Sequence, residues 1–534
     1  MAKPPFDIDA LFPATLKPLT LGLLEENARL TTENEALREE NARLKGLKGK
    51  PDIKPRSKPP ANKPSGMDKA SDKRPRREGK QKRGPKKPSA PVEERRVAVD
   101  GIPPGSRFKG FEPFTVQELR IEARTVCYQR ERWVTPDGVT MLAPLPHGIT
   151  DHFGPELKRF ILAQYHQGQT TVQRLVDLLQ GLGVAISKRQ VVRILTGSND
   201  RFVTEAQDVL RAGLTHGRWI SVDDTGARHQ GRNGVCTQIG NDAFTAFATT
   251  FSKSRLNFLD LLRAGHGDYV LNAQAFAAMR QRGLAGTVIA RLAAHPARFF
   301  ADAAAWTAHL EALEIAGRAV HPDPVRIATE GALWGSICAH GFLKEAVILS
   351  DDAGQFNVGE HALCWVHAER LVHKLDTFTE AARKAKDLVQ SLIWWLYADL
   401  KAYRAAPTPR RKAELKARFD RIFNRRTGFV TLDRLLARLR ANKDELLRVL
   451  DRPDIPLHTN GSENDIRCQV TRRKVSATTQ SDDGRDCRDA FLGLNKTCRK
   501  LGIPFWDYIG TRLGAAVRNP VPHLPDLVAA RCQA

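Results

Sequence analysis

The sequence lacks any run of apolar residues that could span a membrane. Hydrophobic residues make up 41% of its 534 residues, but no run reaches the length of about 18 residues that a membrane-spanning helix requires. The N-terminal segment also has no apolar stretch of the kind found in secretory signals. The sequence therefore predicts a cytosolic protein without a membrane partner.

Cysteine pairs are also absent, because none of the eight cysteines forms a CxxC motif. This scattered arrangement argues against a disulfide framework and against a cysteine-rich zinc site. The cysteines are Cys127, Cys236, Cys338, Cys364, Cys468, Cys487, Cys498 and Cys532.

Acidic residues are in the minority. The chain has 84 Lys and Arg against 60 Asp and Glu, a net charge of +24. A basic excess of this size indicates a polyanionic partner, most often nucleic acid. The length predicts three or four domains and at least one sizeable core.

Residues 20–47 carry a leucine heptad typical of a coiled coil. The leucines alternate with asparagines at the facing core positions, a pattern that favours a parallel, in-register dimer. We therefore expect a homodimer or a higher oligomer formed through this segment. The heptad positions are Leu23, Leu30, Leu37 and Leu44, with Asn27, Asn34 and Asn41 between them.

Residues 48–91 contain 16 Lys or Arg, four Asp or Glu, nine prolines and no aromatic residue. Such a segment cannot bury a core, so a disordered basic linker is expected. Segments of this kind bind phosphate backbones without reading sequence. Between residues 92 and 148, short β-like runs broken by Pro and Gly predict a small β-rich module.

Residues 149–200 have the pattern of a helix-turn-helix. Thr170 or Thr171 is expected to cap one helix, and Ser187 is expected to cap a second, shorter helix. The short helix would expose basic side chains to DNA, although an ordinary helical hairpin has the same pattern. The basic side chains are Lys188, Arg189 and Arg193.

Two strand-like runs each end in a pair of carboxylates. The first ends in Asp223 and Asp224 and leads into a predicted β-meander. The second ends in Asp351 and Asp352. Only one member of each pair can point into a shared site, because side chains alternate along a strand.

A third carboxylate is predicted on a helix. Asn460 or Ser462 could cap this helix. Glu463, Arg467 and Lys474 then share one face, since offsets of four and eleven return to nearly the same angle. A surface ion pair between Glu463 and Arg467 is the simpler alternative.

Two acids at neighbouring strand ends and one on a helix can together bind two Mg²⁺ ions, an arrangement that activates water or a 3′-hydroxyl at a phosphodiester. Hard cations bind oxygen ligands, so this chemistry needs carboxylates rather than Cys or His. The three sites together, in a basic chain, indicate a DNA- or RNA-processing enzyme.

From the coiled coil to the C-terminus, the sequence resembles the DDE transposases of the IS66 insertion-sequence family. The resemblance is carried by Val222–Thr225, Leu349–Phe356, Cys364–Arg370 and Asn460–Arg467, the last followed by Arg472, Arg473 and Lys474.

The resemblance implies that Asp223, Asp351 and Glu463 are the catalytic and metal-binding acids. Asp224 and Asp352 are then the less probable ligands. The cofactor would be two Mg²⁺ ions, with Mn²⁺ as a substitute. Many relatives also carry a cysteine-rich zinc segment after the coiled coil, which is missing here, so no structural zinc is predicted.

For the fold, the resemblance implies an α/β RNase H-like catalytic domain over 215–510. It would carry a helical insertion at about 368–450 and be followed by a C-terminal tail at 511–534. The coiled coil, linker, β-rich module and helix-turn-helix precede it.

The function implied is metal-dependent cleavage at the terminal inverted repeats of an insertion sequence, and joining of the 3′-ends to target DNA. The protein would act in the bacterial cytosol or nucleoid, with small companion proteins encoded by the element. DNA-binding roles are expected for Arg467, Arg472, Arg473 and Lys474 in addition to the helix-turn-helix.

Two other functions fit parts of the sequence. A non-catalytic dimeric DNA-binding protein, such as a repressor of the element, needs the N-terminal features but not the three acids. An RNase H-like nuclease without strand transfer needs the acids, and only the family resemblance separates it from a transposase.

Several residues near these motifs have a simpler structural interpretation. Trp394 and Trp395 could stack on a DNA base, but core packing is favoured for them and for Trp365. Cys364 and His367 have a CxxH spacing without a second pair, so a structural role is favoured.

Overall fold

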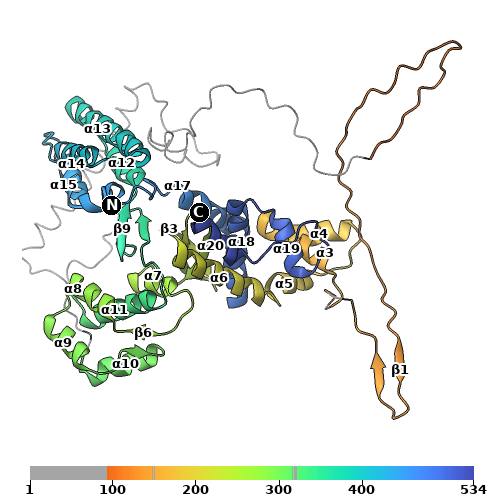
Figure 1. The fold of residues 1–534 in the computed structure, drawn as a ribbon, viewed down its shortest axis with the longest axis horizontal. Helices are drawn as coiled ribbons and strands as arrows, with labels where there is room; N and C mark the ends of the chain where they lie inside the picture. Colours follow the sequence, from red (N-terminus) through yellow and green to blue (C-terminus); the bar gives the residue numbers. More distant parts are fainter. Residues whose placement is uncertain (1–92, 147, 150, 316, 318–321, 534) are drawn as a thin grey trace, which may run out of the picture. The chain divides into compact units, whose positions relative to one another are not determined.

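The computed structural model describes residues 93–146, 148–149, 151–315, 317 and 322–533. The predicted coiled coil at 20–47 and the predicted basic linker at 48–91 lie outside these residues. Figure 1 shows the course of the chain.

Residues 93–146 form an extended segment with one short hairpin. In this hairpin β1 (Arg132–Val134) pairs antiparallel with β2 (Thr140–Leu142). The side chains along the segment are almost all exposed. The β-rich module predicted for 92–148 thus contains a single two-stranded element among its described residues.

Helices follow where the helix-turn-helix was predicted. Thr171 caps α4 (Val172–Gly181) by accepting a hydrogen bond from the Arg174 N–H. Ser187 caps α5 (Lys188–Thr196), as predicted, in a reciprocal capping box with Gln190. In chain order the elements are α3 (Pro155–Leu162), a π-helical turn (Ala163–Gln167), α4 (Val172–Gly181), α5 (Lys188–Thr196) and α6 (Asp200–His216).

A five-stranded mixed sheet with the order β5-β4-β3-β8-β9 forms the centre of the next part. The first three strands in sequence are the predicted antiparallel meander, while β8 runs parallel to β3 and β9 runs parallel to β8. The strands are β3 (Trp219–His229), β4 (Arg232–Gly240), β5 (Thr245–Thr250), β8 (Val347–Ser350) and β9 (Glu360–Leu363).

Helices α6, α18 (Asp482–Leu501) and α20 (Leu524–Gln533) pack together beside β5 and bury a shared apolar core. The prediction of a C-terminal tail at 511–534 is wrong for α20. Leu524 and Val528 are both fully buried, so α20 belongs to the folded core. Preceding it, α19 (Phe505–Leu513) is joined to α6 by an ion pair of 2.7 Å between Arg512 and Glu205.

A helical subdomain that the sequence did not predict lies between β5 and β8. It buries its own apolar side chains around Trp306, Met279 and Leu333, next to the core of the sheet. Its elements are α7 (Arg255–Leu262), β6 (Tyr269–Val270), α8 (Ala273–Gln281), α9 (Gly286–Ala294), β7 (Phe299–Phe300), α10 (Ala303–Ala312) and α11 (Pro324–Ala339).

The second helical region follows β9, where an insertion was predicted at about 368–450. It has a separate apolar core that includes Trp365, Phe419 and Leu436. Among the described residues, no helix has the length and apolarity needed to cross a membrane. The helices are α12 (Trp365–His373), α13 (Glu380–Ala405), α14 (Pro409–Phe423), α15 (Val430–Ala441) and α16 (Lys443–Leu446), with a 3₁₀ turn at Arg448–Leu450.

Candidate active site

Asp223 on β3 and Asp351, the residue directly after β8, lie at equivalent places along two neighbouring parallel strands. Ser221 of β3 pairs with Leu349 of β8, and each acid follows its paired residue by two positions. Adjacent strands are about 4.8 Å apart, and residues two apart point to the same face. The charge of Asp351 accordingly contributes to raising the pKa of Asp223.

The second acid of each pair is engaged elsewhere. Asp224 accepts a hydrogen bond of 2.8 Å from Gln355 and pairs with Lys253 at 2.8 Å. Asp352, at a positive φ of 78°, pairs with Arg438 and accepts a hydrogen bond of 3.2 Å from Asn442. Both second acids thus already have cationic or amide partners.

Helix α17 (Asn460–Ser476) brings the third acid to the sheet. Ser462, one residue before Glu463, shares a buried hydrogen bond of 2.5 Å with Ser221 of β3. The sequence predicted Asn460 or Ser462 as the cap, but the helix begins at Asn460 after Thr459. Ser462 is instead inside the first turn and attaches the helix to the strand.

The segment before α17 is attached to the start of α12. The Trp365 N–H donates to the Leu457 carbonyl oxygen at 3.0 Å. The Thr459 N–H donates to the Cys364 sulfur at 3.3 Å. Cys364 is therefore a buried structural residue, in agreement with the sequence interpretation.

Glu463 is surrounded by basic side chains. Its carboxylate lies 3.2 Å from an Arg370 nitrogen and 3.4 Å from His367 Nε2. The predicted pair with Arg467 is longer, at 3.8 Å, and Arg467 is exposed. Sequence reasoning missed the first two contacts, although a helix from Trp365 places His367 and Arg370 three residues apart on one face.

The electrostatics of the site show crowded negative charge beside β3. Burial, reinforced by the charge of Asp351, raises the pKa of Asp223 to about 6, although the Asp224 N–H donates to its carboxylate at 2.8 Å. Burial lowers the pKa of His367, but its contact with Cys364 and the charge of Glu463 outweigh that effect and raise the pKa to about 9.

This imbalance fits a site for hard divalent cations. Within the described residues, no Lys or Arg forms an ion pair with Asp223 or Asp351, whereas Asp224 and Asp352 have such partners. Carboxylate oxygens are the ligands that Mg²⁺ prefers. Asp223, Asp351 and Glu463 are the residues that could hold such ions.

Of the basic residues predicted to bind DNA on α17, Arg467 and Lys474 are exposed and Arg473 is partly exposed. Arg473 donates a hydrogen bond to the Gly226 carbonyl oxygen of β3. Each of the three lies on the helix that carries Glu463.

Arg472 corrects the prediction that all of these cations face DNA. It is 2% exposed, and its guanidinium stacks 3.5 Å from the centre of the Tyr165 ring. It also donates to the carbonyl oxygens of Tyr165 and Thr170. Helical geometry explains the error, because residues 467 and 472 point in different directions. Arg472 joins α17 to the helix-turn-helix region instead of binding phosphate.

In the helix-turn-helix region, the three predicted DNA-binding residues Lys188, Arg189 and Arg193 are exposed on α5. The opposite face of α5 is buried through Val191, Ile194 and Leu195. The arrangement leaves the basic face of this short helix available to a partner.

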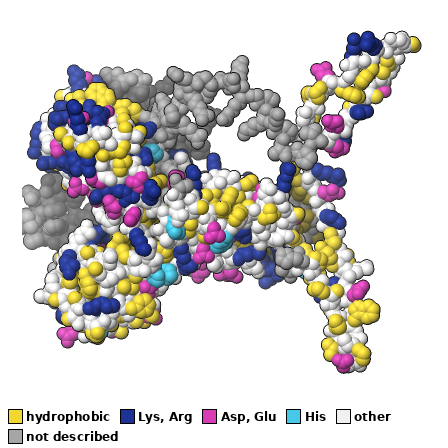
Figure 2. All heavy atoms as spheres, in the orientation of Figure 1, with side chains coloured by type: hydrophobic (Ala, Val, Ile, Leu, Met, Phe, Trp, Pro, Cys, Tyr) yellow, Lys and Arg dark blue, Asp and Glu magenta, His cyan; other side chains and the backbone are white. Residues whose placement is uncertain are grey.

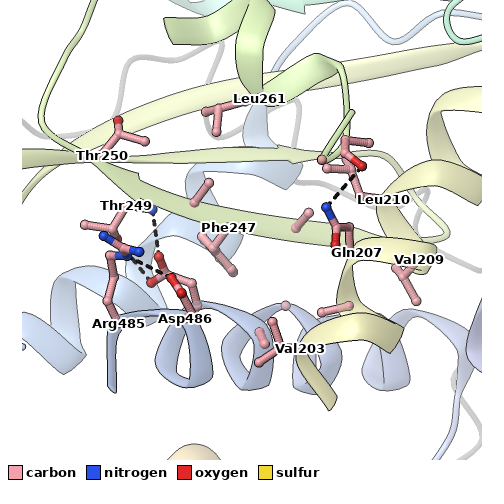
Figure 3. A pocket seen from close by; sticks show the side chains of 18 of the residues that line it. Val203, Gln207, Val209, Leu210, Phe247, Thr249, Thr250, Leu261, Arg485 and Asp486 are labelled. Atoms are coloured by element: carbon pink, nitrogen blue, oxygen red, sulfur yellow. Dashed lines mark hydrogen bonds and ion pairs between the residues drawn. The ribbon is translucent and has the colours of Figure 1, made fainter. Parts of the chain in front are cut away.

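A cavity of about 700 Å³ lies outside the carboxylate site, between α6, β5, α7 and α18. Figure 3 shows its largely apolar lining, with Phe247 and Val203 among the apolar side chains and Arg485 and Asp486 as a charged pair. None of Asp223, Asp351 and Glu463 lines it.

Comparison with known proteins identifies the family. The sequence model described as "Transposase IS66 family" matches residues 336–486, the span that contains Asp351 and Glu463. The chain belongs to the IS66 transposase family. Membership places it among DNA-processing enzymes.

The chain is also similar to the uncharacterized protein y4jO of Sinorhizobium fredii. That protein is 50% identical to this IS66 family member over 325 residues. The match covers 60% of this chain and 100% of the relative.

The tryptophans near the site differ in their surroundings. Trp365 is 1% exposed and donates to the Leu446 carbonyl oxygen at 2.8 Å, so it is a core residue, as expected. It begins α12 and is not part of a strand. Trp394 packs against the core of the insertion, whereas Trp395 is 55% exposed.

Proposed function

We propose that this protein is a DDE transposase that binds the ends of an insertion sequence, cleaves DNA there and joins the 3′-ends to target DNA. The observation that carries the proposal is the shared register of Asp223 on β3 and Asp351 directly after β8, with Glu463 attached to β3 through Ser462. Family membership supports the same chemistry.

We further propose that the catalytic domain has an RNase H-like fold. The support is the strand order β5-β4-β3-β8-β9, in which an antiparallel meander is extended by two parallel strands. In this arrangement the first acid is on the central strand, the second follows the neighbouring strand and the third is on a later helix.

Asp223, Asp351 and Glu463 would hold two Mg²⁺ ions, or Mn²⁺ in their place. When bound, such ions activate the attacking oxygen and stabilise the leaving oxygen of a phosphodiester. The protein itself provides the position of the carboxylates. It also keeps His367 and Arg370 beside Glu463, where they orient that side chain and offset its charge.

DNA would be held by basic side chains on three surfaces of the protein. Lys188, Arg189 and Arg193 of α5 are exposed and suit a groove or backbone contact at the element end. Arg467, Arg473 and Lys474 of α17 would position the phosphates beside the acids.

The helical insertion offers a third basic surface. Residues 409–443 contain 12 Lys or Arg against three Asp or Glu. Figure 2 shows Lys and Arg side chains gathered over α14 and α15. A surface of this charge favours the phosphate backbone of either the element or the target.

Pairing of two DNA ends requires at least two protomers. The leucine heptad at 20–47 would supply this contact, and small companion proteins would act with the assembled protein. A two-fold oligomer matches two element ends related by symmetry.

The test is a cleavage and joining assay on labelled element ends with Mg²⁺ or Mn²⁺, comparing wild type with Glu463→Gln. The amide keeps the size of the side chain and removes its charge. Metal-dependent joining by wild type that is lost in the variant, with DNA binding unchanged, supports the proposal.

Two other outcomes would count against it. Equal products from both proteins would refute the role of Glu463. DNA binding without products, even after the companion proteins are added, would favour a repressor, and cleavage without joining would favour a nuclease.

A further inference from the structure

Three metal-binding side chains meet in the helical subdomain. His266 follows α7, Asp268 directly precedes β6, and His340 caps the C-terminus of α11. One donor atom from each lies within 4.8 Å of the other two. None of these residues belongs to the carboxylate site.

We propose that His266, Asp268 and His340 bind one Zn²⁺ ion that joins the α7 loop to β6 and α11. Zinc accepts two imidazoles and one carboxylate, and a water molecule would complete its tetrahedral coordination. Mg²⁺ prefers an all-oxygen set, so this site would select a different cation from the catalytic one. The proposal departs from the absence of structural zinc that the cysteine pattern predicted.

Asp268 is already fixed as a metal ligand would be. It is 7% exposed, and its Oδ1 lies 2.9 Å from His340 Nε2. Its other carboxylate oxygen, Oδ2, accepts a hydrogen bond of 3.1 Å from Ser336, a fully buried residue of α11. Contacts of this kind orient metal ligands and are commonly found around metal sites.

The loop that carries His266 is also held in place. The Ala264 carbonyl oxygen accepts hydrogen bonds from Gln207 at 3.1 Å and from Arg211 at 3.0 Å, both on α6. Ala264 and Gly265 have φ values of 50° and 87°. A left-handed alanine is strained, and such strain persists where the surroundings fix the backbone.

Helix α11 lies close to β6, which fixes the distance between His340 and Asp268. A Cβ atom at Gly335 would lie 2.0 Å from the Val270 carbonyl oxygen, so only glycine fits this approach. The Asn272 side chain donates to the Gly335 carbonyl oxygen at 2.8 Å. The donor groups are thus positioned by packed backbone.

The two arginines near the site each have a carboxylate partner of their own. Arg211 pairs with Asp208 at 3.0 Å, and Arg263 pairs with Asp260. His266 and His340 are partly exposed, so an ion has access from solvent.

The competing explanation is a purely structural pair of His340 and Asp268 at the C-terminus of α11, where positive charge is favourable. The rings of His266 and His340 are stacked, with centres 3.6 Å apart and planes at 14°. Zinc binding would require one ring to turn so that both nitrogens point at the same ion. A purely structural pair of His340 and Asp268 would require no such ring movement.

The experiment is a Zn²⁺ titration of the chelator-treated full-length protein by calorimetry, with excess Mg²⁺ present to occupy the carboxylate site. Wild type is compared with His340→Ala and Asp268→Asn. The matched control is His295→Ala in the same subdomain, where the His295 ring contacts the His309 ring at 4.6 Å between centres and lies outside the cluster of His266, Asp268 and His340. Far-UV circular dichroism checks that each variant is folded.

We expect one Zn²⁺ per chain in wild type and in His295→Ala. Affinity should fall at least about tenfold in the two site variants. Co²⁺ should give the visible spectrum of a tetrahedral site in wild type and in His295→Ala, but not in His340→Ala or Asp268→Asn. No binding in wild type, or equal binding in all four proteins, would overturn the proposal without affecting the proposed transposase function.

Discussion

Ser221 and Ser462, which are far apart in sequence, share a buried hydrogen bond of 2.5 Å between β3 and α17. Asp223 follows Ser221 by two residues and Glu463 follows Ser462 directly, so this contact joins the strand that carries the first acid to the helical turn that carries the third.

Replacing Asp351 with Asn should reduce strand joining by roughly a hundredfold or more, the scale of losing one charge-stabilising group at a reaction centre. Asp352→Asn is the matched control, since Asp352 already binds Arg438 and Asn442. It should retain most activity. Single-turnover joining assays measure both, and equal losses would contradict the division of roles.

The stability of the metal-free protein should depend on Asp223 and on pH. Burial raises the pKa of this carboxyl to about 6, so its favourable contribution is present at low pH and is lost as pH rises through 6. Between pH 4 and pH 7 the free energy of unfolding of wild type should therefore fall by up to about 2–3 kcal/mol relative to that of Asp223→Asn. Urea unfolding of both proteins at the two pH values measures this, and added Mg²⁺ should abolish the difference at pH 7.

Arg472→Ala should destabilise the fold instead of weakening DNA contacts directly. The guanidinium is buried against Tyr165 and hydrogen-bonded to backbone oxygens, so its loss should cost about 2–4 kcal/mol in unfolding free energy. The control is Arg467→Ala on the same helix, where the side chain is 68% exposed. That variant should unfold like wild type but bind DNA more weakly.

Substitutions of Ser187 and Lys188, which are adjacent at the start of α5, should separate an effect on folding from an effect on DNA binding. Ser187→Ala removes a helix cap and should cost about 1 kcal/mol of stability. Lys188→Ala leaves the cap intact. Loss of one phosphate contact should make the slope of log K against log salt concentration shallower by about one. Salt titrations of binding to an element end distinguish the two, and an unchanged slope in Lys188→Ala would count against phosphate contact.

Periodicity and capping chemistry predicted the local elements correctly. The capped helix at Ser187, the β-meander after Asp223 and the helices across 368–450 follow from short-range patterns. That only one acid of each pair faces the site, as strand alternation indicates, stays a prediction.

Features that depend on tertiary packing were missed. Nothing local identifies Tyr165 as the residue on which Arg472 packs and is buried. Residues 511–534 resemble a tail until α6 supplies an apolar surface for Leu524 and Val528. The helices from α7 to α11 also depend on distant contacts, such as Trp306 with Tyr269.

The helical insertion separates Asp351 from Glu463 along the chain, and this has a consequence for biosynthesis. During translation all five strands emerge before α12, and α17 emerges only after α16. A nascent or prematurely terminated polypeptide would therefore possess the complete sheet with two acids but lack the third. On the proposed function, a product that ends before Glu463 would be unable to cut the chromosome, and DNA breakage would begin only after α17 has been synthesised.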